Sequence, residues 1–417
     1  MARILMTTSD HLMIDRRILQ EAQTLTLAGH DVTILAGFEC ASSSSYELGK
    51  IKIKRFAYDW SDRRFVEGAK KLGLVAGSRL HYLAARTFNV WAARSARINS
   101  FEQFVIDRML IEEFDVIHAH DFPMLGAAVE VARTRDVPLL YDAHELYYAQ
   151  IQLAPHTRKK YKSREKRLIK SADVTVTVNP HIAKLMAQRY RIPSPRVILN
   201  AAPLQRVERT GRLRDRFGLA PGTKIVMYQG WISANRGIET FVEAAEYLSP
   251  GIALAIVGYG DFENSLKAIV EQKNLQGKVF FFGGVPSDQL HEITCEADLG
   301  VIPYIGVDDN NYFCSPNKLF EFAVASVPFI SNNLPFLADI IREYQNGIAR
   351  DITTPRSMAS TIADVFSDAS RLQQLRDGCE LARQSLNWEI ESKKLIDIYS
   401  ELIPSRDLKS SGGNARE

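Results

Sequence analysis

Short apolar runs typical of buried strands alternate with amphipathic segments of helical spacing along most of this chain, and the alternation begins twice. The first series opens with ARILMTT at residues 2–8, and the second opens with GTKIVMYQG at residues 222–230. Strands that alternate with helices form parallel sheets covered on both faces. Since 417 residues also exceed what one hydrophobic core accommodates, we expect an α/β protein with two Rossmann-like, doubly wound parallel-sheet domains facing a cleft.

A proline-containing segment near residues 200–215 marks the expected boundary between the two domains. Residues 60–110 interrupt the first alternation with arginine-rich sequence of helical spacing, which we interpret as a basic amphipathic insertion. The first strand–helix turn, TTSDHLMIDRR, lacks a GxGxxG pattern, and this argues against a dinucleotide-dependent dehydrogenase. The expected parts are a first domain, a second domain, a C-terminal helix and a disordered tail: residues 1–205, 206–388, 389–404 and 405–417.

The two halves of the chain carry opposite net charges. Residues 1–200 hold 30 Lys and Arg against 21 Asp and Glu, a net of +9, so the remainder of the +3 chain carries +3 − 9 = −6. The run at residues 158–170 has eight basic residues against one acid, and a solvated helix face is the usual explanation for such a run. Together with the insertion at 60–110, it also predicts contact with an anionic membrane surface. Nucleic acid is the less favoured partner, because no nucleic-acid-binding motif accompanies the charge.

The cysteines and the apolar stretches indicate where the protein works. Four widely spaced cysteines show neither a disulfide framework nor metal-ligand spacing, which fits a reducing compartment. No stretch approaches the roughly 18 apolar residues of a membrane span, and the N-terminal apolar run is soon followed by charge. The expected location is the cytoplasm, and the basic segments suggest peripheral attachment to the inner face of the membrane.

A polar loop that leads into a helix, NNYFCSPNKLFEF at residues 310–322, predicts an anion site. Ser315 and Pro316 resemble a helix cap followed by a first-turn proline, so unpaired amide groups around Ser315 and Asn317 would face a ligand. Such a helix start attracts phosphate, and Lys318 adds a positive charge. Glu321 could accept hydrogen bonds from hydroxyls. A nucleotide or nucleotide sugar offers both groups, although a plain capped helix with solvated charges fits the same residues about equally well.

Further polar and glycine residues follow the predicted strands. Arg236 lies where a helix is expected to start, a position that favours a diphosphate partner. Gly258 and Val285 follow two other strands, where a ligand could approach the backbone or simple turns could form. In the first domain two clusters end adjacent strands: His118, His120 and Asp121, and then Asp142, His144 and Glu145. Zinc is the minor alternative for these clusters, because their spacing matches no known metal motif; hydrogen bonding to a sugar or phosphate suits them better, and His118 could be a core histidine.

With these residues in place, the chain resembles the retaining nucleotide-sugar glycosyltransferases of the GT-B architecture, in particular the large family-4-like group and its SPNKLFE-bearing subgroup. The resemblance extends from RILMTT to the end of the second predicted sheet. Its most specific parts are the stretches FDVIHAHD, YDAHE, YQGWISANRGIE, VGYGD, FFGGVPSDQLHEITCEADLGVIPY and SPNKLFEFAVASVPFISNN.

The resemblance implies roles for individual residues. That family usually has two glutamates eight positions apart; Glu321 matches the second, at the ribose, whereas Phe313 stands at the first, near the sugar. Arg236 matches a phosphate-binding lysine, and the companion arginine position falls on Gly230 or Trp231. His144 resembles the histidine beside the transferred sugar and leaving phosphate. The expected site is then completed in three groups: His144, Arg236 and Lys318 as catalytic; Gly230, Gly258, Val285, Ser315, Asn317 and Glu321 as donor-binding; Asp15, Arg16 and Asp121 on the acceptor side, with Arg17 also in the first cleft loop.

The implied activity is transfer of a sugar from a nucleotide-diphosphate sugar to an acceptor, with retention of the anomeric configuration and without an obligatory metal or other cofactor. The acceptor would be a glycan or a lipid-linked intermediate of cell-surface polysaccharide or glycolipid synthesis, bound by the first domain. The resemblance also implies that the helix from Glu389 to Leu402 crosses back to the first domain. Two alternatives stay open, namely a nucleotide-sugar 2-epimerase of the same fold and a catalytically silent sugar-nucleotide-binding partner.

Overall fold

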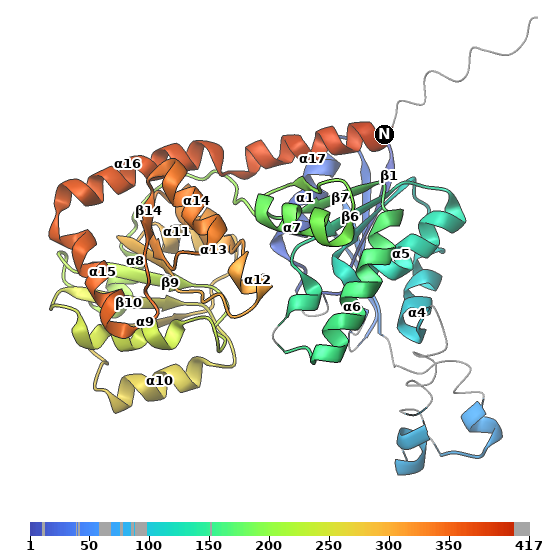
Figure 1. The fold of residues 1–417 in the computed structure, drawn as a ribbon, viewed down its shortest axis with the longest axis horizontal. Helices are drawn as coiled ribbons and strands as arrows, with labels where there is room; N and C mark the ends of the chain where they lie inside the picture. Colours follow the sequence, from blue (N-terminus) through green and yellow to red (C-terminus); the bar gives the residue numbers. More distant parts are fainter. Residues whose placement is uncertain are drawn as a thin grey trace, which may run out of the picture.

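The chain folds into two α/β units that lie beside one another and are connected along one edge by long C-terminal helices (Figure 1). The structure is a computed structural model, and it describes residues 1–10, 13–38, 40, 42–57, 68–75, 78–84, 87, 98–150 and 152–403. Much of the predicted insertion at 60–110 and the predicted tail at 405–417 lie outside these described residues.

Within the described residues the first sheet has eight strands in the order β3-β4-β2-β1-β5-β6-β7-β8. Neighbouring strands are parallel except at β3, which pairs with β4 in antiparallel register. Residues of β3 are all exposed, so this edge hairpin has none of the buried alternation that would predict it. The strands are β1 (Arg3–Thr8), β2 (Asp31–Ala36), β3 (Ser44–Leu48), β4 (Ile51–Arg55), β5 (Val116–His120), β6 (Leu139–Ala143), β7 (Val174–Thr177) and β8 (Arg196–Val197).

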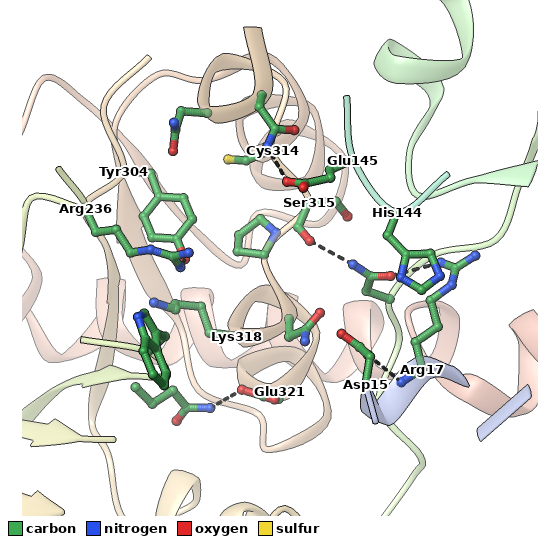
Figure 2. Close-up of a pocket in the computed structure, with 18 of the residues that line it drawn as sticks. Asp15, Arg17, His144, Glu145, Arg236, Tyr304, Cys314, Ser315, Lys318 and Glu321 are labelled. Atoms are coloured by element: carbon green, nitrogen blue, oxygen red, sulfur yellow. Dashed lines mark hydrogen bonds between the residues drawn. The ribbon is translucent and has the colours of Figure 1, made fainter. Parts of the chain in front are cut away.

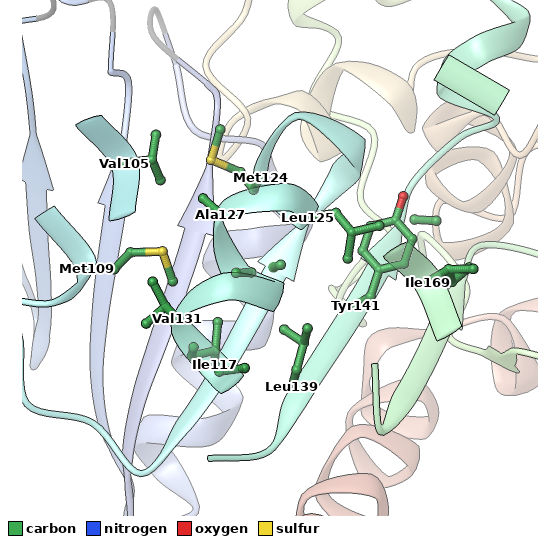
Figure 3. Packing of buried hydrophobic residues seen from close by; sticks show 14 of the residues in the cluster. Val105, Met109, Ile117, Met124, Leu125, Ala127, Val131, Leu139, Tyr141 and Ile169 are labelled. Atoms are coloured by element: carbon green, nitrogen blue, oxygen red, sulfur yellow. The ribbon is translucent and has the colours of Figure 1, made fainter. Parts of the chain in front are cut away.

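Helices cover both faces of this first sheet and bury one apolar cluster on each face. Figure 3 shows the cluster in which side chains of α4 and α5 meet Ile117, Leu139 and Tyr141 of the sheet. The apolar spacing of these helices, repeated every three to four residues, is what places them there. The helical segments of this domain are α1 (Arg16–Leu27), α4 (Ser100–Met109), α5 (Asp121–Arg135), η1 (Tyr147–Ala149), α6 (Pro155–Leu168), η2 (Ile169–Ser171) and α7 (Pro180–Tyr190).

The second sheet is parallel throughout, in the order β11-β10-β9-β12-β13-β14. Its central strands are buried on both faces, which explains why they appear in the sequence as continuous apolar runs. The strands are β9 (Lys224–Gln229), β10 (Ile252–Val257), β11 (Val279–Gly283), β12 (Leu299–Ile302), β13 (Phe329–Ser331) and β14 (Gly347–Ala349). The helical segments are α8 (Arg212–Phe217), α9 (Ile238–Ala244), η3 (Ala245–Tyr247), α10 (Glu263–Gln272), α11 (Leu290–Thr294), α12 (Asp309–Tyr312), α13 (Asn317–Val324), α14 (Pro335–Tyr344), α15 (Pro355–Ser367), α16 (Ala369–Ser385) and α17 (Trp388–Leu402).

Both sheets reverse their strand order at a central pair, β1 with β5 in the first and β9 with β12 in the second. The crevice outside the carboxyl ends of strands at such a reversal is the usual ligand site of an open parallel sheet. The expected fold class, two doubly wound parallel-sheet domains, is therefore confirmed. Polar residues follow these strand ends in both domains, so the sequence also predicts that they meet in the crevice between the domains.

The last helix, α17, packs on the first domain although it follows the second in sequence. Leu395, Ile398 and Tyr399 of α17 join the apolar cluster beneath β1 and β2. Trp388 donates a hydrogen bond through Nε1 to Thr24 Oγ1 at 2.9 Å. This helix fastens the two domains to one another at the edge away from the polar loops.

Two glycines cross at close range where β9 and β10 end. A Cβ atom on Gly258 would lie 2.0 Å from the carbonyl oxygen of Gly230, and Gly258 also has a φ of +149°, a backbone conformation that other residues rarely adopt. The sequence assigned Gly258 to the donor site. In the structure it lies behind Gly230 and supports that residue's position.

We expect Gly258→Ala to lower the melting temperature by about 10 °C, because backbone strain and overpacking each cost about 1–3 kcal/mol in a domain of this size. Thermal unfolding followed by circular dichroism measures the change. Gly222→Ala is the matched control, since a Cβ there meets nothing within 4 Å. Equal melting temperatures for the two variants would contradict the packing role of Gly258.

Candidate functional site

A cavity of about 560 Å³ opens between the two domains, at the carboxyl ends of both sheets (Figure 2). The first domain contributes charged residues that follow β1, β5 and β6, and the second contributes the loop after β9 and the start of α13. The polar residues that line the cavity are Asp15, Arg17, Asp121, His144, Glu145, Asn200, Gln229, Arg236, Tyr304, Asn310, Asn311, Ser315, Asn317, Lys318 and Glu321. Most residues that the sequence assigned to the site are thus brought together.

Lys318 is the most unusual side chain in the cavity. It is only 4% exposed, and its Nζ has no hydrogen-bond partner among the residues that the structure describes. The ammonium lies 3.7 Å from the ring centroid of Tyr228 and 4.9 Å from that of Tyr304. Burial, and then the nearby charge of Arg236, hold the pKa of Lys318 well below its usual value. An anion that entered the cavity would oppose this shift and favour the charged form of Lys318.

Arg236 lies in the loop after β9 and extends over Tyr304. Its guanidinium carbon is 5.2 Å from the Tyr304 ring centroid, and Nη1 donates to the phenol oxygen. The sequence predicted a helix from Arg236, but α9 begins at Ile238 because Asn235 and Gly237 both adopt left-handed backbone conformations. The tight loop keeps Arg236 outside the helix and directs it to the cavity that Lys318 also lines (Figure 2).

The start of α13 differs in one detail from the prediction. Pro316 occupies the N-cap position, and Ser315 is not a cap: its hydroxyl donates to the carbonyl of Val178 at 3.3 Å. The carbonyl of Ser315 accepts a hydrogen bond from Asn200 Nδ2 at 3.1 Å. No side chain caps α13, and the Leu319 N–H donates to the carbonyl of Pro316 at 3.0 Å. The amide groups of Asn317 and Lys318 are therefore the ones left for an anion at this helix start.

Glu321 lies one turn further along α13 and connects the domains. It accepts a hydrogen bond from Gln229 Nε2 at 2.5 Å and forms an ion pair with Arg16 at 2.8 Å. The sequence placed Arg16 on the acceptor side, and the structure brings it to the predicted ribose-binding carboxylate. A hydroxyl ligand at Glu321 would therefore share this carboxylate with Arg16.

His144 is held between two carboxylates of the first domain. Its Nε2 lies 3.1 Å from Asp142, its Nδ1 lies 3.7 Å from Asp121, and its backbone N–H donates to Asp121 at 3.0 Å. Burial alone would lower the pKa of His144, but the charges of Asp121 and Asp142 outweigh it and raise the pKa to about 10. Asp121 itself has a φ of 61°, a strained conformation of the kind that often occurs at functional sites. The imidazolium is thus available to an anionic ligand at neutral pH.

Arg17 binds the carboxylate of Asp142 and fixes its position. Its Nε and Nη2 donate to the two carboxylate oxygens of Asp142 at 3.1 and 3.0 Å, and Nη1 donates to Ile198 O and Asn200 Oδ1. Sequence reasoning named Arg17 only as a cleft residue. The missed signal was that Arg17 and Glu21 occupy core-facing positions of α1, four residues apart, where charged residues are rare.

Four buried residues beneath this site could hold a metal by residue type, because ligand atoms of Glu21, His118, His120 and Asp142 lie within 4.8 Å of one another. The guanidinium of Arg17 already lies among them, with Nε 2.9 Å from Glu21. Burial, followed by the charge of Asp142, raises the pKa of Glu21 to about 8, and burial lowers the pKa of His120 to about 4. A protonated Glu21, neutral histidines and the Arg17–Asp142 pair balance the charge, so this arrangement does not favour an added cation.

Two other predicted residues lie outside the cavity lining. Val285 packs against an apolar cluster of the second domain. Phe313 packs against the first domain, where its ring stacks on His181. Neither side chain is among those that line the cavity.

Comparisons with known proteins decide the family. Residues 14–202 match the family described as a glycosyl transferase 4-like domain, and residues 210–379 match the one described as glycosyl transferases group 1. The chain belongs to the group 1 glycosyltransferases. Among curated proteins, this glycosyltransferase is similar to the D-inositol 3-phosphate glycosyltransferase of Xylanimonas cellulosilytica, with 22% identity over 318 residues that cover 70% of this chain and 73% of that protein.

Solved structures share the fold of this group 1 glycosyltransferase at low identity. Sucrose-phosphate synthase from Thermosynechococcus elongatus superposes with a TM-score of 0.72 at 16% identity, over 96% of this chain and 98% of that one. The Anabaena protein HepE, crystallised with UDP-glucose, gives a TM-score of 0.68 at 12% identity, over 96% and 100% of the two chains. The expected GT-B architecture is confirmed by these likenesses.

We expect Asp121→Asn to shift the alkaline limb of the kcat–pH profile to lower pH. Asp121 supplies the largest opposing charge on His144, so its loss lowers the pKa of His144 from about 10 toward the ordinary 6.5, and the imidazolium is lost at lower pH. Asparagine tolerates the left-handed backbone and can still accept the His144 N–H.

Asp136→Asn is the control, because Asp136 is exposed and also left-handed, with a φ of 52°, at the other end of α5. The measurement is the rate of product formation under saturating substrate at pH 6–10.5 for the wild type and both variants. An alkaline limb that Asp121→Asn leaves unmoved would contradict the assigned role of Asp121.

Proposed function

We propose that this group 1 glycosyltransferase moves a sugar from a nucleoside-diphosphate sugar to an acceptor hydroxyl with retention of the anomeric configuration. The observation that carries the proposal is the buried Lys318 ammonium, which has no hydrogen-bond partner among the described residues and lines the same cavity as Arg236 and the open start of α13. These groups together offer a diphosphate the side chains of Lys318 and Arg236 and the amide groups of Asn317 and Lys318. The crystal structure of HepE with UDP-glucose supports a nucleotide sugar as the class of donor.

In the proposed complex the diphosphate lies on Arg236, Lys318 and the first amides of α13. The ribose hydroxyls donate to Glu321, which also keeps Gln229 as a partner. The bond between the anomeric carbon and the phosphate oxygen breaks while the acceptor oxygen bonds to the same face of that carbon. The acceptor proton passes to the leaving phosphate, whose negative charge the two cations stabilise. No obligatory metal or other cofactor takes part in this scheme.

His144 acts on the sugar side of the leaving phosphate. Asp121 and Asp142 keep it protonated and fix its ring. Its Nε2 already lies 3.1 Å from Asp142 and from His120 Nδ1, so Nδ1 is the ring nitrogen that would donate a hydrogen bond to the sugar or to the phosphate. No side chain is assigned as a covalent nucleophile. Asp15 and Asp121, which line the first-domain side of the cavity, are then left to contact the acceptor.

The acceptor is proposed to be a glycan or lipid-linked intermediate of cell-surface polysaccharide or glycolipid synthesis, reached from an anionic membrane surface. Exposed Lys159, Lys160, Arg167 and Lys170 of α6 and η2 support this proposal. Other basic residues of the run point inward, because Arg164 pairs with Glu102 and Lys162 lies over the ring of Tyr148. In the described part of the chain, no helix is long and apolar enough to cross a membrane.

We expect Lys318→Met and Arg236→Ala each to lower the transfer rate by about 100-fold or more, the usual effect of removing one group that stabilises charge in a transition state. Transfer from radiolabelled donors to a lipid-linked acceptor panel measures the rate. Methionine keeps the packing of Lys318 against Tyr228 while removing its charge.

Arg342→Ala is the matched control, because the Arg342 side chain is 74% exposed and pairs only with Asp339 of the same helix among the described residues. Near-normal transfer by both cavity variants would overturn the assignment of the diphosphate site. Conversion of the donor sugar in the absence of acceptor would instead point to a 2-epimerase of the same fold.

A further inference from the structure

The side chain of Phe313 faces away from the cavity, although the next residue, Cys314, lines it. The Phe313 ring lies 6.1 Å from the His181 ring at an interplanar angle of 22°. Its carbonyl accepts a hydrogen bond from Asn179 Nδ2 at 2.8 Å. Both partners belong to the start of α7 in the first domain. Residue 313 therefore anchors its loop to the first domain, and any acid that faces a sugar in the cavity must come from elsewhere.

Glu145 is such an acid. It follows β6, lines the cavity, and is held from both domains: Asn310 Nδ2 donates to its Oε2 at 2.5 Å, and Gln150 donates to its Oε1. Asn310 is itself fixed, because its Oδ1 accepts the backbone N–H of Leu146 at 3.2 Å. Each oxygen of a carboxylate can accept about two hydrogen bonds, so both oxygens of Glu145 keep capacity for hydroxyl groups. The carboxylate is thus rigid and still able to bind a ligand.

The charges in the cavity are divided between its two sides (Figure 2). Arg236 and Lys318 lie on the second-domain side, where the diphosphate is proposed, together with Glu321, whose carboxylate pairs with Arg16. On the first-domain side the lining includes three carboxylates, those of Asp15, Asp121 and Glu145, besides the imidazolium of His144 and an Arg17 whose guanidinium is bound by Asp142. The carboxylate of a uronic acid would be repelled by these carboxylates on the first-domain side.

We propose that Glu145 is a specificity-determining residue that accepts hydrogen bonds from hydroxyls of the transferred sugar, and that this sugar is an uncharged hexose rather than a uronic acid. The inference rests on the proposed function, because it needs a nucleoside-diphosphate sugar in the cavity. A fixed carboxylate that accepts hydrogen bonds from sugar hydroxyls discriminates strongly between ligands. It disfavours a ligand that offers it no hydroxyl, and it repels a ligand that brings a negative charge.

The test compares neutral and acidic donors that share a base. Glucose with glucuronate, and mannose with mannuronate, each carried on UDP, GDP, ADP and TDP, are offered to the wild type and to Glu145→Gln. We expect the wild type to prefer the neutral member of its accepted pair by about 100-fold or more in kcat/KM. The acidic donor loses a hydrogen bond to Glu145, and its carboxylate is repelled by that of Glu145. In Glu145→Gln we expect kcat/KM with the neutral donor to fall by about tenfold or more. The ratio of kcat/KM for the neutral donor to that for the acidic donor falls by a similar factor.

Glu113→Gln is the matched control. It makes the same chemical change in the same domain, but the Glu113 side chain is 84% exposed, pairs with Arg3 and does not line the cavity. We expect its preference for the neutral donor to match that of the wild type. Calorimetric titration with the free nucleoside diphosphate provides a second readout, which we expect Glu145→Gln to leave unchanged because Arg236 and Lys318 are intact.

Four outcomes would overturn the inference. The wild type could use both members of a pair equally, Glu145→Gln could keep both the rate and the preference for the neutral donor, or Glu113→Gln could reduce that preference as much as Glu145→Gln. Loss of nucleoside-diphosphate binding in Glu145→Gln would show that the residue only maintains the fold. Absence of both transfer and nucleoside-diphosphate binding in the wild type would overturn the proposed function itself, whereas binding with equal use of both sugars overturns only this inference.

Discussion

The buried ammonium of Lys318 is the constraint on which the rest of the site depends. A charged group removed from water without a hydrogen-bond partner costs several kcal/mol, and its pKa falls unless an opposite charge is near. Here the nearest recorded contacts are the faces of Tyr228 and Tyr304, which offset only about 2 kcal/mol each. Arg236, drawn over Tyr304 by the tight loop at Asn235 and Gly237, adds a second positive charge. This arrangement is unfavourable by itself and becomes favourable when an anion enters.

Hydrogen bonds and ion pairs between the two domains hold them together around the cavity. The loop around α12 is bound by first-domain side chains at several points: Glu145 with Asn310, Arg189 with Asp309, and Asn179 with the carbonyl of Phe313. On the opposite side of α13, Arg16 reaches Glu321. The residues proposed to bind the donor and the polar residues of the first domain are therefore held at the same edge. A ligand that bound Glu321 would compete with the ion pair that Arg16 forms with it across the two domains. The packing of α17 on α1 is a further contact that keeps the two units together.

The sequence predicts the fold and much of the site because both depend on local order. Apolar runs and helical spacing define nearly every buried strand, and Lys318, Glu321 and His144 stand directly after predicted strand ends or at a predicted helix start. The features that the sequence did not predict depend on contacts with residues that are far away along the chain. The burial of Arg17 needs Asp142 and Ile198, the hydroxyl of Ser315 is taken by Val178, and Phe313 is turned by His181 and Asn179. The exposed strand β3 had no apolar pattern to reveal it.

The measurement that tests the central claim most directly is the melting temperature of the protein with UDP-, GDP-, ADP- and TDP-sugars, in the wild type and in Lys318→Met. A donor present at 100 times its Kd stabilises the folded state by about 2.7 kcal/mol, which raises the melting temperature by several degrees. The account predicts such an increase for at least one base in the wild type and its loss in Lys318→Met. A wild type whose melting temperature no nucleotide sugar raises, or a variant that responds as the wild type does, would contradict it.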